Sequence, residues 1–181
     1  MLVLVAYATK YGSTERIAEF IADRLRVGGL EAHAFPVEAV REVAAYDAVL
    51  VGSATYMGHW LKPARAFVER FRDTLAGRPT WLFSSGPLGS SATDDQGRDL
   101  HDVAVPTEIP ELAEMVRPRG HAVFFGVLDS HRLGFRERAI RLTPVGRSIL
   151  PEGDFRDWRE IGAWAASIAE ELSVSRTAAV S

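Results

Sequence analysis

The chain has 181 residues, of which 47% are hydrophobic and 25% are charged, and these proportions are typical of a globular protein rather than of a disordered or collagen-like chain. The net charge of −3 disfavours a general nucleic-acid binder, and the lack of cysteine excludes disulfides, thiolate metal sites and cysteine nucleophiles. No apolar run approaches the ~20 residues needed to cross a bilayer, and no basic flank or cleavage site marks a signal peptide, so we expect a cytoplasmic protein.

Five short segments have the composition of β-strands. Four are nearly continuous apolar runs, as expected of strands covered on both faces of a parallel sheet: Leu2–Tyr7, Ala48–Gly52, Thr80–Phe83 and Ala122–Leu128. The remaining segment, Glu31–Pro36, is more polar and ends in proline, which is typical of an edge strand.

Helical periodicity fills the gaps between these strands. The apolar positions of the first helix recur every four residues: Ile17, Ile21 and Leu25. Pro63 suits the first turn of a second helix, and Asp154 is the predicted N-cap of a long last helix. The alternation predicts βαβ units in a three-layer α/β domain at residues 1–173, followed by a disordered tail at 174–181.

A long insertion, Asp129–Gly153, separates the fifth predicted strand, Ala122–Leu128, from the last helix, where a connection of about 2–6 residues is usual. It carries five arginines: Arg132, Arg136, Arg138, Arg141 and Arg147. Phe135, Ala139 and Leu142 have helical spacing, which predicts a helix that packs these side chains on the domain. Two interpretations stay open: a solvated surface helix, or an element that docks on a partner or on a membrane surface.

The first strand leads into a hydroxyl-rich turn before the first helix. We expect six residues of this turn to bind a phosphate through backbone N–H groups and side chains: Thr9, Lys10, Tyr11, Gly12, Ser13 and Thr14. The turn has neither the Gly-Lys-Ser/Thr ending of a P-loop nor a Gly-x-Gly-x-x-Gly fingerprint, so it predicts a single phosphate rather than a nucleoside triphosphate or a dinucleotide. The alternative is that Ser13 or Thr14 only caps the helix.

Two more loops follow predicted strands, Ser53–Trp60 after the third and Ser84–Ser90 after the fourth. Open α/β sheets bind ligands at the carboxyl ends of their strands, so these loops predict a slot for a flat ring, with Tyr56 or Trp60 stacked on it. The candidate ring-binding residues are Thr55, Tyr56, Met57, Gly58, Trp60, Ser85, Gly86, Pro87, Leu88 and Gly89. The alternative is that Trp60 caps the next helix and Gly86-Pro87 forms an ordinary turn.

Over nearly its whole length the sequence resembles the flavodoxin family. The resemblance begins at the phosphate loop, Thr9-x-x-Gly12-Ser13-Thr14, and implies a five-stranded parallel sheet in the order 2-1-3-4-5 with helices on both faces. Within the family the sequence is most similar to the branch of menaquinone-dependent protoporphyrinogen oxidases. The segments that carry this similarity are Val51-Gly52-Ser53-Ala54, Gly58-His59, Phe67-Val68, the basic insertion and Asp157-Trp158.

The resemblance implies FMN as cofactor and an FMN-dependent oxidoreductase or electron-transfer protein. Two functions stay open: oxidation of protoporphyrinogen with a quinone as acceptor, and electron transfer to protein partners. The arginine-rich insertion favours the first, since arginines there would meet porphyrin carboxylates or an anionic membrane surface. His59 is the catalytic candidate, against the interpretation of a histidine satisfied by local backbone. The five histidines show no metal-ligand spacing, so no metal site is expected.

Overall fold

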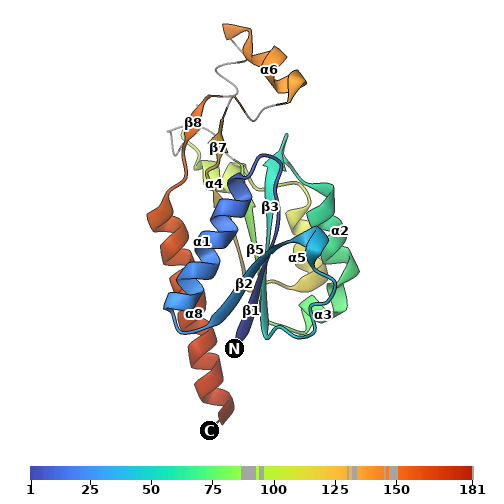
Figure 1. Cartoon of the computed structure of the whole chain (residues 1–181), viewed down its shortest axis with the longest axis vertical. Helices are drawn as coiled ribbons and strands as arrows, with labels where there is room; N and C mark the ends of the chain where they lie inside the picture. The colour runs from blue at the N-terminus through green and yellow to red at the C-terminus, as the bar shows by residue number, and fades with distance from the viewer. Residues whose placement is uncertain are drawn as a thin grey trace.

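The computed structural model describes residues 1–86, 93, 96–129, 131, 134–144, 146 and 151–180. Five parallel strands form its central sheet: β1 (Leu2–Ala8), β2 (Glu31–Pro36), β3 (Ala48–Tyr56), β5 (Thr80–Ser85) and β6 (Gly120–Phe124). Their spatial order is β2-β1-β3-β5-β6, which confirms the predicted 2-1-3-4-5 arrangement with Glu31–Pro36 at an edge (Figure 1).

Helices cover both faces of this sheet (Figure 1). One face carries α1 (Ser13–Val27) and α8 (Trp158–Val180), which contact each other. The other face carries α2 (Lys62–Arg70), α3 (Arg72–Ala76) and α5 (Ile109–Val116). Short helical turns, η1 (Val37–Ala39) and α4 (Leu100–Val103), lie in the connections. Because α8 is helical through Val180, a boundary between domain and tail at residues 173 and 174 stays a prediction.

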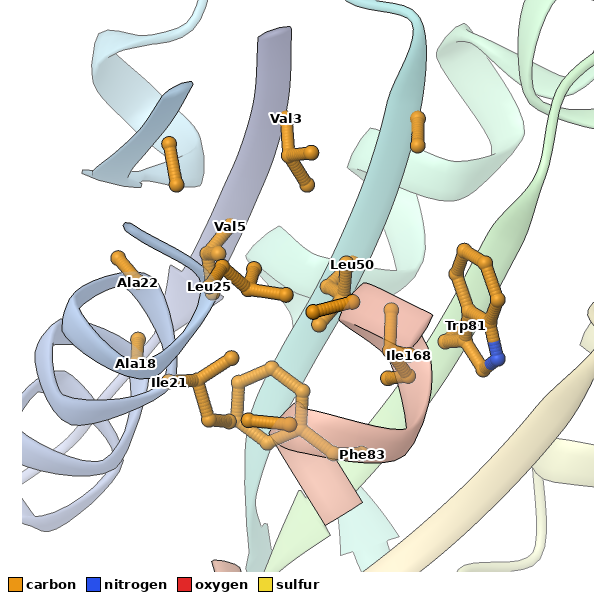
Figure 2. Packing of buried hydrophobic residues seen from close by; sticks show 14 of the residues in the cluster. Val3, Val5, Ala18, Ile21, Ala22, Leu25, Leu50, Trp81, Phe83 and Ile168 are labelled. Carbon is orange, nitrogen blue, oxygen red and sulfur yellow. The ribbon is translucent and has the colours of Figure 1, made fainter. Parts of the chain in front are cut away.

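The core consists of two clusters, one on each side of the sheet, because successive side chains of a strand point to opposite faces. In β1, Val3 and Val5 pack under α1 and α8, whereas Leu4 and Ala6 pack under α2 and α5. Figure 2 shows the first cluster, in which Leu25 of α1 lies beside Val5 and Ile21 lies beside Phe83. Burial on both faces is the reason these strands read as continuous apolar runs.

Two of the predicted strands, the third and the fifth, differ most from the structure. The third strand continues past Gly52 to Tyr56, because its last two residues pair with a short antiparallel strand, β4 (His59–Trp60). The fifth predicted strand, Ala122–Leu128, is not one strand: it divides into β6 and β7 (Val127–Leu128). The latter leaves the main sheet to pair with β8 (Gly153–Asp154).

The N-terminus of α8 corrects a second prediction. Asp154 lies in β8 and its carboxylate accepts from the Arg156 guanidinium, so it does not cap the helix. The cap is Asp157, whose Oδ1 accepts from the backbone N–H groups of Arg159 at 2.8 Å and Glu160 at 3.2 Å. A carboxylate three residues closer to the helix reaches the unpaired N–H groups that Asp154 cannot.

Within the insertion, helix α6 (Phe135–Arg141) lies beyond the β7–β8 pair and away from the sheet (Figure 1). Two of the side chains predicted to pack on the domain are exposed instead: Phe135 at 88%, and Leu142, which directly follows the helix, at 82%. Of the five arginines, only Arg138 has a described side chain, which is exposed and donates to the His131 carbonyl. Among the described residues, no helix is both long and apolar enough to cross a membrane.

The outer edge of β2 is covered by one side chain from α1. Arg26 donates from Nε and Nη2 to the carbonyl oxygen of Ala32, at 2.9 and 2.6 Å. Its Nη1 also contacts Asp23, which holds the guanidinium over the strand.

Candidate functional site

A narrow cavity lies at the carboxyl ends of the parallel strands, where such sheets bind ligands. It is lined by the turn after β1, the end of β3, the residues after β5 and those between β6 and β7: Thr9, Lys10, Tyr11, Ser13, Ala54, Thr55, Tyr56, Ser85, Gly86, Gly126, Val127, Leu128 and Asp129. Its volume is about 100 Å³. Pro87, Leu88 and Gly89, which we predict on the ring side, lie outside the described residues.

The turn between β1 and α1 is closed by a hydrogen bond and a glycine with positive φ. Thr9 Oγ1 accepts from the Gly12 N–H at 3.0 Å, and Gly12 has a φ of 86°, which favours glycine. Gly12 is also the N-cap of α1, and no side chain caps this helix. The geometry therefore does not support the alternative in which Ser13 or Thr14 acts only as a cap, and the helix N-terminus remains suited to an anion.

Two threonine hydroxyls at this site are buried without partners. Thr14 is fully buried, and its Oγ1 has no hydrogen-bond partner in the described part of the chain. The same holds for the Oγ1 of Thr55, which lines the cavity. An unsatisfied buried hydroxyl costs about 1–3 kcal/mol, so the Thr55 hydroxyl in the lining favours a polar ligand in this cavity. Thr14 directly follows the lining residue Ser13 but does not itself line the cavity.

Ser13 connects the turn after β1 to neighbouring segments at the same edge of the sheet. Its Oγ accepts from the Val127 N–H at 3.2 Å and lies 3.5 Å from the Ser85 Oγ. These contacts join the start of α1 to the end of β5 and to β7 beside the cavity. The predicted phosphate loop and the predicted Ser85–Gly86 segment are therefore brought together.

The end of β3 and the start of β4 form a tight hairpin beside the cavity. Met57 and Gly58 both have positive φ, 53° and 79°, and Met57 is 83% exposed. The Gly58 carbonyl accepts from the Thr107 N–H at 3.0 Å and from the Thr107 Oγ1 at 3.3 Å, so the segment before α5 holds the tip. Tyr56 lines the cavity, and its stacking on a flat ring stays a prediction.

Trp60 is positioned differently from Tyr56. Its side chain is only 4% exposed, packs in the core with α2 and does not line the cavity. The indole Nε1–H donates to Ser84 Oγ at 2.8 Å, and Ser84 Oγ lies 2.8 Å from His121 Nε2. Burial lowers the pKa of His121 to about 4, so its ring is neutral at pH 7 and shares a hydrogen bond with the Ser84 hydroxyl. Of the two predicted aromatic residues, only Tyr56 faces the cavity.

His59 lies outside the cavity and pairs with a carboxylate. Its Nδ1 lies 2.8 Å from Glu108 Oε1, and Glu108 Oε2 accepts from the Trp60 N–H. Burial opposes ionisation of Glu108, but the hydrogen bonds from Trp60 and His59 outweigh it and hold the pKa of this carboxyl below its usual value. His59 thus supports the hairpin from outside, and a catalytic role for it stays a prediction.

Sequence reasoning missed the cavity residues that follow β6 and the two residues that hold the hairpin. Gly126–Asp129 could have been found, because every parallel strand ends at this edge of the sheet. Thr107 and Glu108 carry no comparable signal, since they lie far from the hairpin in sequence. The described residues hold no cluster of three or more His, Asp or Glu side chains suited to a metal ion.

An open parallel sheet in this strand order, with a hydroxyl-lined cavity at a helix N-terminus, defines the flavodoxin-like class of α/β proteins. The profile of the flavodoxin domain matches residues 4–142, and the chain belongs to this family. The chain is also similar to the protoporphyrinogen IX dehydrogenase (quinone) of Escherichia coli strain K12. The two are 28% identical over 176 residues, which cover 93% of this chain and 95% of the relative.

Solved structures show the same fold. A flavodoxin from the domain Archaea matches with a TM-score of 0.57 and 18% identity, over 96% of this chain and 99% of that one. A flavodoxin variant from Pseudomonas aeruginosa matches with a TM-score of 0.58 and 20% identity, again over 96% and 99%. At these identities the likeness concerns the fold alone.

Proposed function

We propose that this chain binds FMN in the cavity at the strand ends and acts as an FMN-dependent oxidoreductase. The observation that carries the proposal is the buried, unpartnered hydroxyl of Thr55 in the cavity lining of a flavodoxin-family domain. A second such hydroxyl, that of Thr14, directly follows the lining residue Ser13. FMN, when bound, supplies one- and two-electron redox chemistry, while the protein contributes binding, orientation and electrostatics.

The residues fall into two groups by the part of FMN they suit. The phosphate is suited to the turn from Thr9 to Gly12 and to the first residues of α1, Ser13 and Thr14. These residues offer hydroxyls and backbone N–H groups, and the helix N-terminus also favours an anion. Tyr56 offers an aromatic face to the ring, and Thr55 and Ser85 offer hydroxyls between these two ends. One phosphate site without a second glycine-rich fingerprint favours FMN over FAD.

For the reaction, we propose oxidation of a porphyrinogen with a quinone as electron acceptor. The relative from Escherichia coli, with which the chain aligns over 93% of its length, bears that activity in its name. Helix α6 adds support, because its exposed Phe135 and Leu142, in an arginine-rich segment, suit contact with an anionic membrane in which a quinone is dissolved. The chain would then be cytoplasmic with peripheral membrane contact.

A second function, electron transfer to protein partners, is favoured by the hairpin tip. Met57 is a large apolar side chain, 83% exposed, that follows the cavity residue Tyr56 in the chain. Such a residue suits a contact surface for another redox protein. Anaerobic stopped-flow mixing separates the two functions: a porphyrinogen should reduce the FMN-loaded protein, and a menaquinone analogue in vesicles should reoxidise it. Reoxidation by a redox protein alone would support the carrier.

The cofactor assignment is tested with Thr14→Ala. Loss of a hydrogen bond to a charged group costs about 1.5–3 kcal/mol, so FMN affinity should fall roughly 10- to 150-fold. Riboflavin, which lacks the phosphate, should bind almost unchanged, and Thr14→Ser should retain FMN affinity because it keeps the hydroxyl. Fluorescence titration measures all three, and mass spectrometry identifies the released cofactor. Equal losses for FMN and riboflavin, or no flavin after reconstitution, would overturn the assignment.

A further inference from the structure

A second and larger cavity, of about 650 Å³, adjoins the FMN cavity. Its lining comes from the turn after β1, one side of α1, and the segment from β7 to the start of α8: Tyr11, Gly12, Arg16, Glu19, Phe20, Asp23, Val127, Asp129, Arg156 and Trp158. Three residues, Tyr11, Val127 and Asp129, line both cavities. A molecule in the larger cavity would therefore lie next to whatever occupies the smaller one.

Part of the wall is aromatic and rigid. Phe20 of α1 and Trp158 of α8 meet edge to face with ring centroids 5.0 Å apart. Tyr11 adds a third ring from the turn after β1. Aromatic walls of this kind bind broad apolar ring systems at low entropic cost, because the side chains are already fixed by packing.

Arg156 is held in place with one nitrogen unused. Its Nε and Nη2 donate to the two carboxylate oxygens of Asp154, at 2.8 and 2.5 Å, and its guanidinium lies 4.6 Å from the Trp158 ring centroid. The side chain is 11% exposed, yet Nη1 has no acceptor within the described ranges. Arg16 lines the same cavity from α1. A fixed guanidinium with an unsatisfied donor favours a ligand that brings a carboxylate.

The acidic lining residues restrict the ligand further. Glu19, Asp23 and Asp129 would repel a polyphosphate, and together with the arginines they disfavour an uncharged chain such as an isoprenoid. Carboxylates accept from N–H groups, so they suit a ring that carries such donors. A ligand with a broad apolar ring, N–H groups within it and carboxylates at its edge matches all three parts of the lining.

We propose that this cavity is the binding site for a dicarboxylic tetrapyrrole, with Arg156 and Arg16 receiving its carboxylates and Trp158, Phe20 and Tyr11 contacting its ring. The inference rests on the proposed function, because it assigns the porphyrinogen to the cavity that adjoins the FMN cavity. It concerns binding, so it can be tested without turnover.

The test uses protoporphyrin IX, a dicarboxylic tetrapyrrole that cannot donate hydrogen as a porphyrinogen does, and its dimethyl ester. Equilibrium binding to the FMN-loaded protein is measured by porphyrin absorbance and tryptophan fluorescence. Arg156→Gln and Arg16→Gln should each weaken binding of the acid by 10-fold or more, whereas Arg159→Gln, which changes an exposed arginine outside the cavity lining, should not. The ester should bind weakly to every variant. Since Arg156→Gln also removes the partner of Asp154, FMN affinity serves as the control for folding, and the exposed Arg16 gives an independent variant.

The outcomes separate this inference from the proposed function. If the arginine variants bind the acid as tightly as Arg159→Gln does, or if the ester binds as tightly as the acid, the assignment of the cavity is wrong even when the enzyme oxidises porphyrinogens. If the protein binds no flavin, the proposed function fails. Arginine-dependent binding of protoporphyrin by the flavin-free protein would then still support the cavity as a tetrapyrrole site.

Discussion

The ammonium of Lys10 lies 3.6 Å from the centroid of the Tyr56 ring. Lys10 belongs to the turn after β1 and Tyr56 to the end of β3, and both line the cavity at the strand ends. The contact thus joins the predicted phosphate loop to the predicted ring-binding loop through a cation and an aromatic face. Lys10 therefore contacts the predicted ring-binding loop, in addition to its predicted role at the phosphate.

The Lys10–Tyr56 contact should be measurable in the flavin-free protein. A cation–π pair at a partly exposed site contributes about 0.5–1 kcal/mol. We expect a double-mutant cycle with Lys10→Met and Tyr56→Leu, followed by urea unfolding, to give a coupling free energy of that size. A parallel cycle with Lys62→Met, which changes an exposed lysine at the start of α2, should be additive. Additivity in the Lys10 cycle would show that the contact does not form in solution.

Gly52 is required by the ring of Phe83 on the neighbouring strand. The two residues are paired across β3 and β5, and a Cβ at position 52 would lie 1.9 Å from the Phe83 Cζ. We expect Gly52→Ala to destabilise the fold by at least about 1–3 kcal/mol, the usual cost of overpacking a core. Adding Phe83→Leu should recover part of this loss, although Phe83→Leu alone destabilises. Gly77→Ala, whose Cβ would meet no atom closer than 3.5 Å, is the matched control in thermal unfolding. Additive losses in the double variant would rule out the proposed clash.

Stability should fall as the pH is lowered from about 6.5 to about 4, and His121 should account for part of the change. Burial lowers the pKa of His121 from 6.5 to about 4, so in this range the unfolded chain binds a proton that the folded chain does not. The contribution is up to about 3 kcal/mol, present above pH 6.5 and lost progressively below it. His121→Gln keeps an acceptor for Ser84 and should flatten this part of the profile, measured by urea unfolding at several pH values. His33→Gln, an exposed control, should follow the parent protein, and a parent-like slope for His121→Gln would contradict the assignment.

We also predict that α6 and the residue after it contact anionic membranes. Phe135→Ser with Leu142→Ser should weaken binding to anionic vesicles without changing the unfolding free energy, because both side chains are exposed in the folded chain. Vesicle co-sedimentation measures the effect, and Val27→Ser, which changes an exposed apolar residue of α1, is the control. Added salt should weaken binding of the parent protein, since the neighbouring arginines are screened. Unchanged sedimentation of the double variant would remove α6 as the contact.

The order of the sheet could be predicted from sequence because apolar runs reveal strands buried on both faces, and the family resemblance supplied their arrangement. Strand ends were predicted less well, since they depend on distant partners. Tyr56 belongs to β3 only because Trp60 and His59 return to pair with it, and Val127 leaves the main sheet to pair with Asp154. The N-cap of α8 moved from Asp154 to Asp157 for the same reason.

The candidate site shows the same division. The turn from Thr9 to Thr14 could be predicted because its residues are contiguous and precede a helix. The core position of Trp60 could not, because it depends on a hydrogen bond to Ser84 on another strand. Sequence spacing likewise predicted that Phe135 packs on the domain, but its side chain is exposed. Periodicity shows which residues share one face of a helix, but not whether another element covers that face.

The guanidinium of Arg26 over the edge of β2 has a consequence for the behaviour of concentrated protein. An uncovered edge strand is a template on which a strand of another molecule can add by backbone hydrogen bonds. Because Arg26 already occupies the Ala32 carbonyl, an incoming strand would have to displace two hydrogen bonds and approach a positive charge. One side chain of a neighbouring helix thereby limits the addition of a strand from another molecule to this sheet. We expect it to reduce aggregation of the folded chain at high concentration.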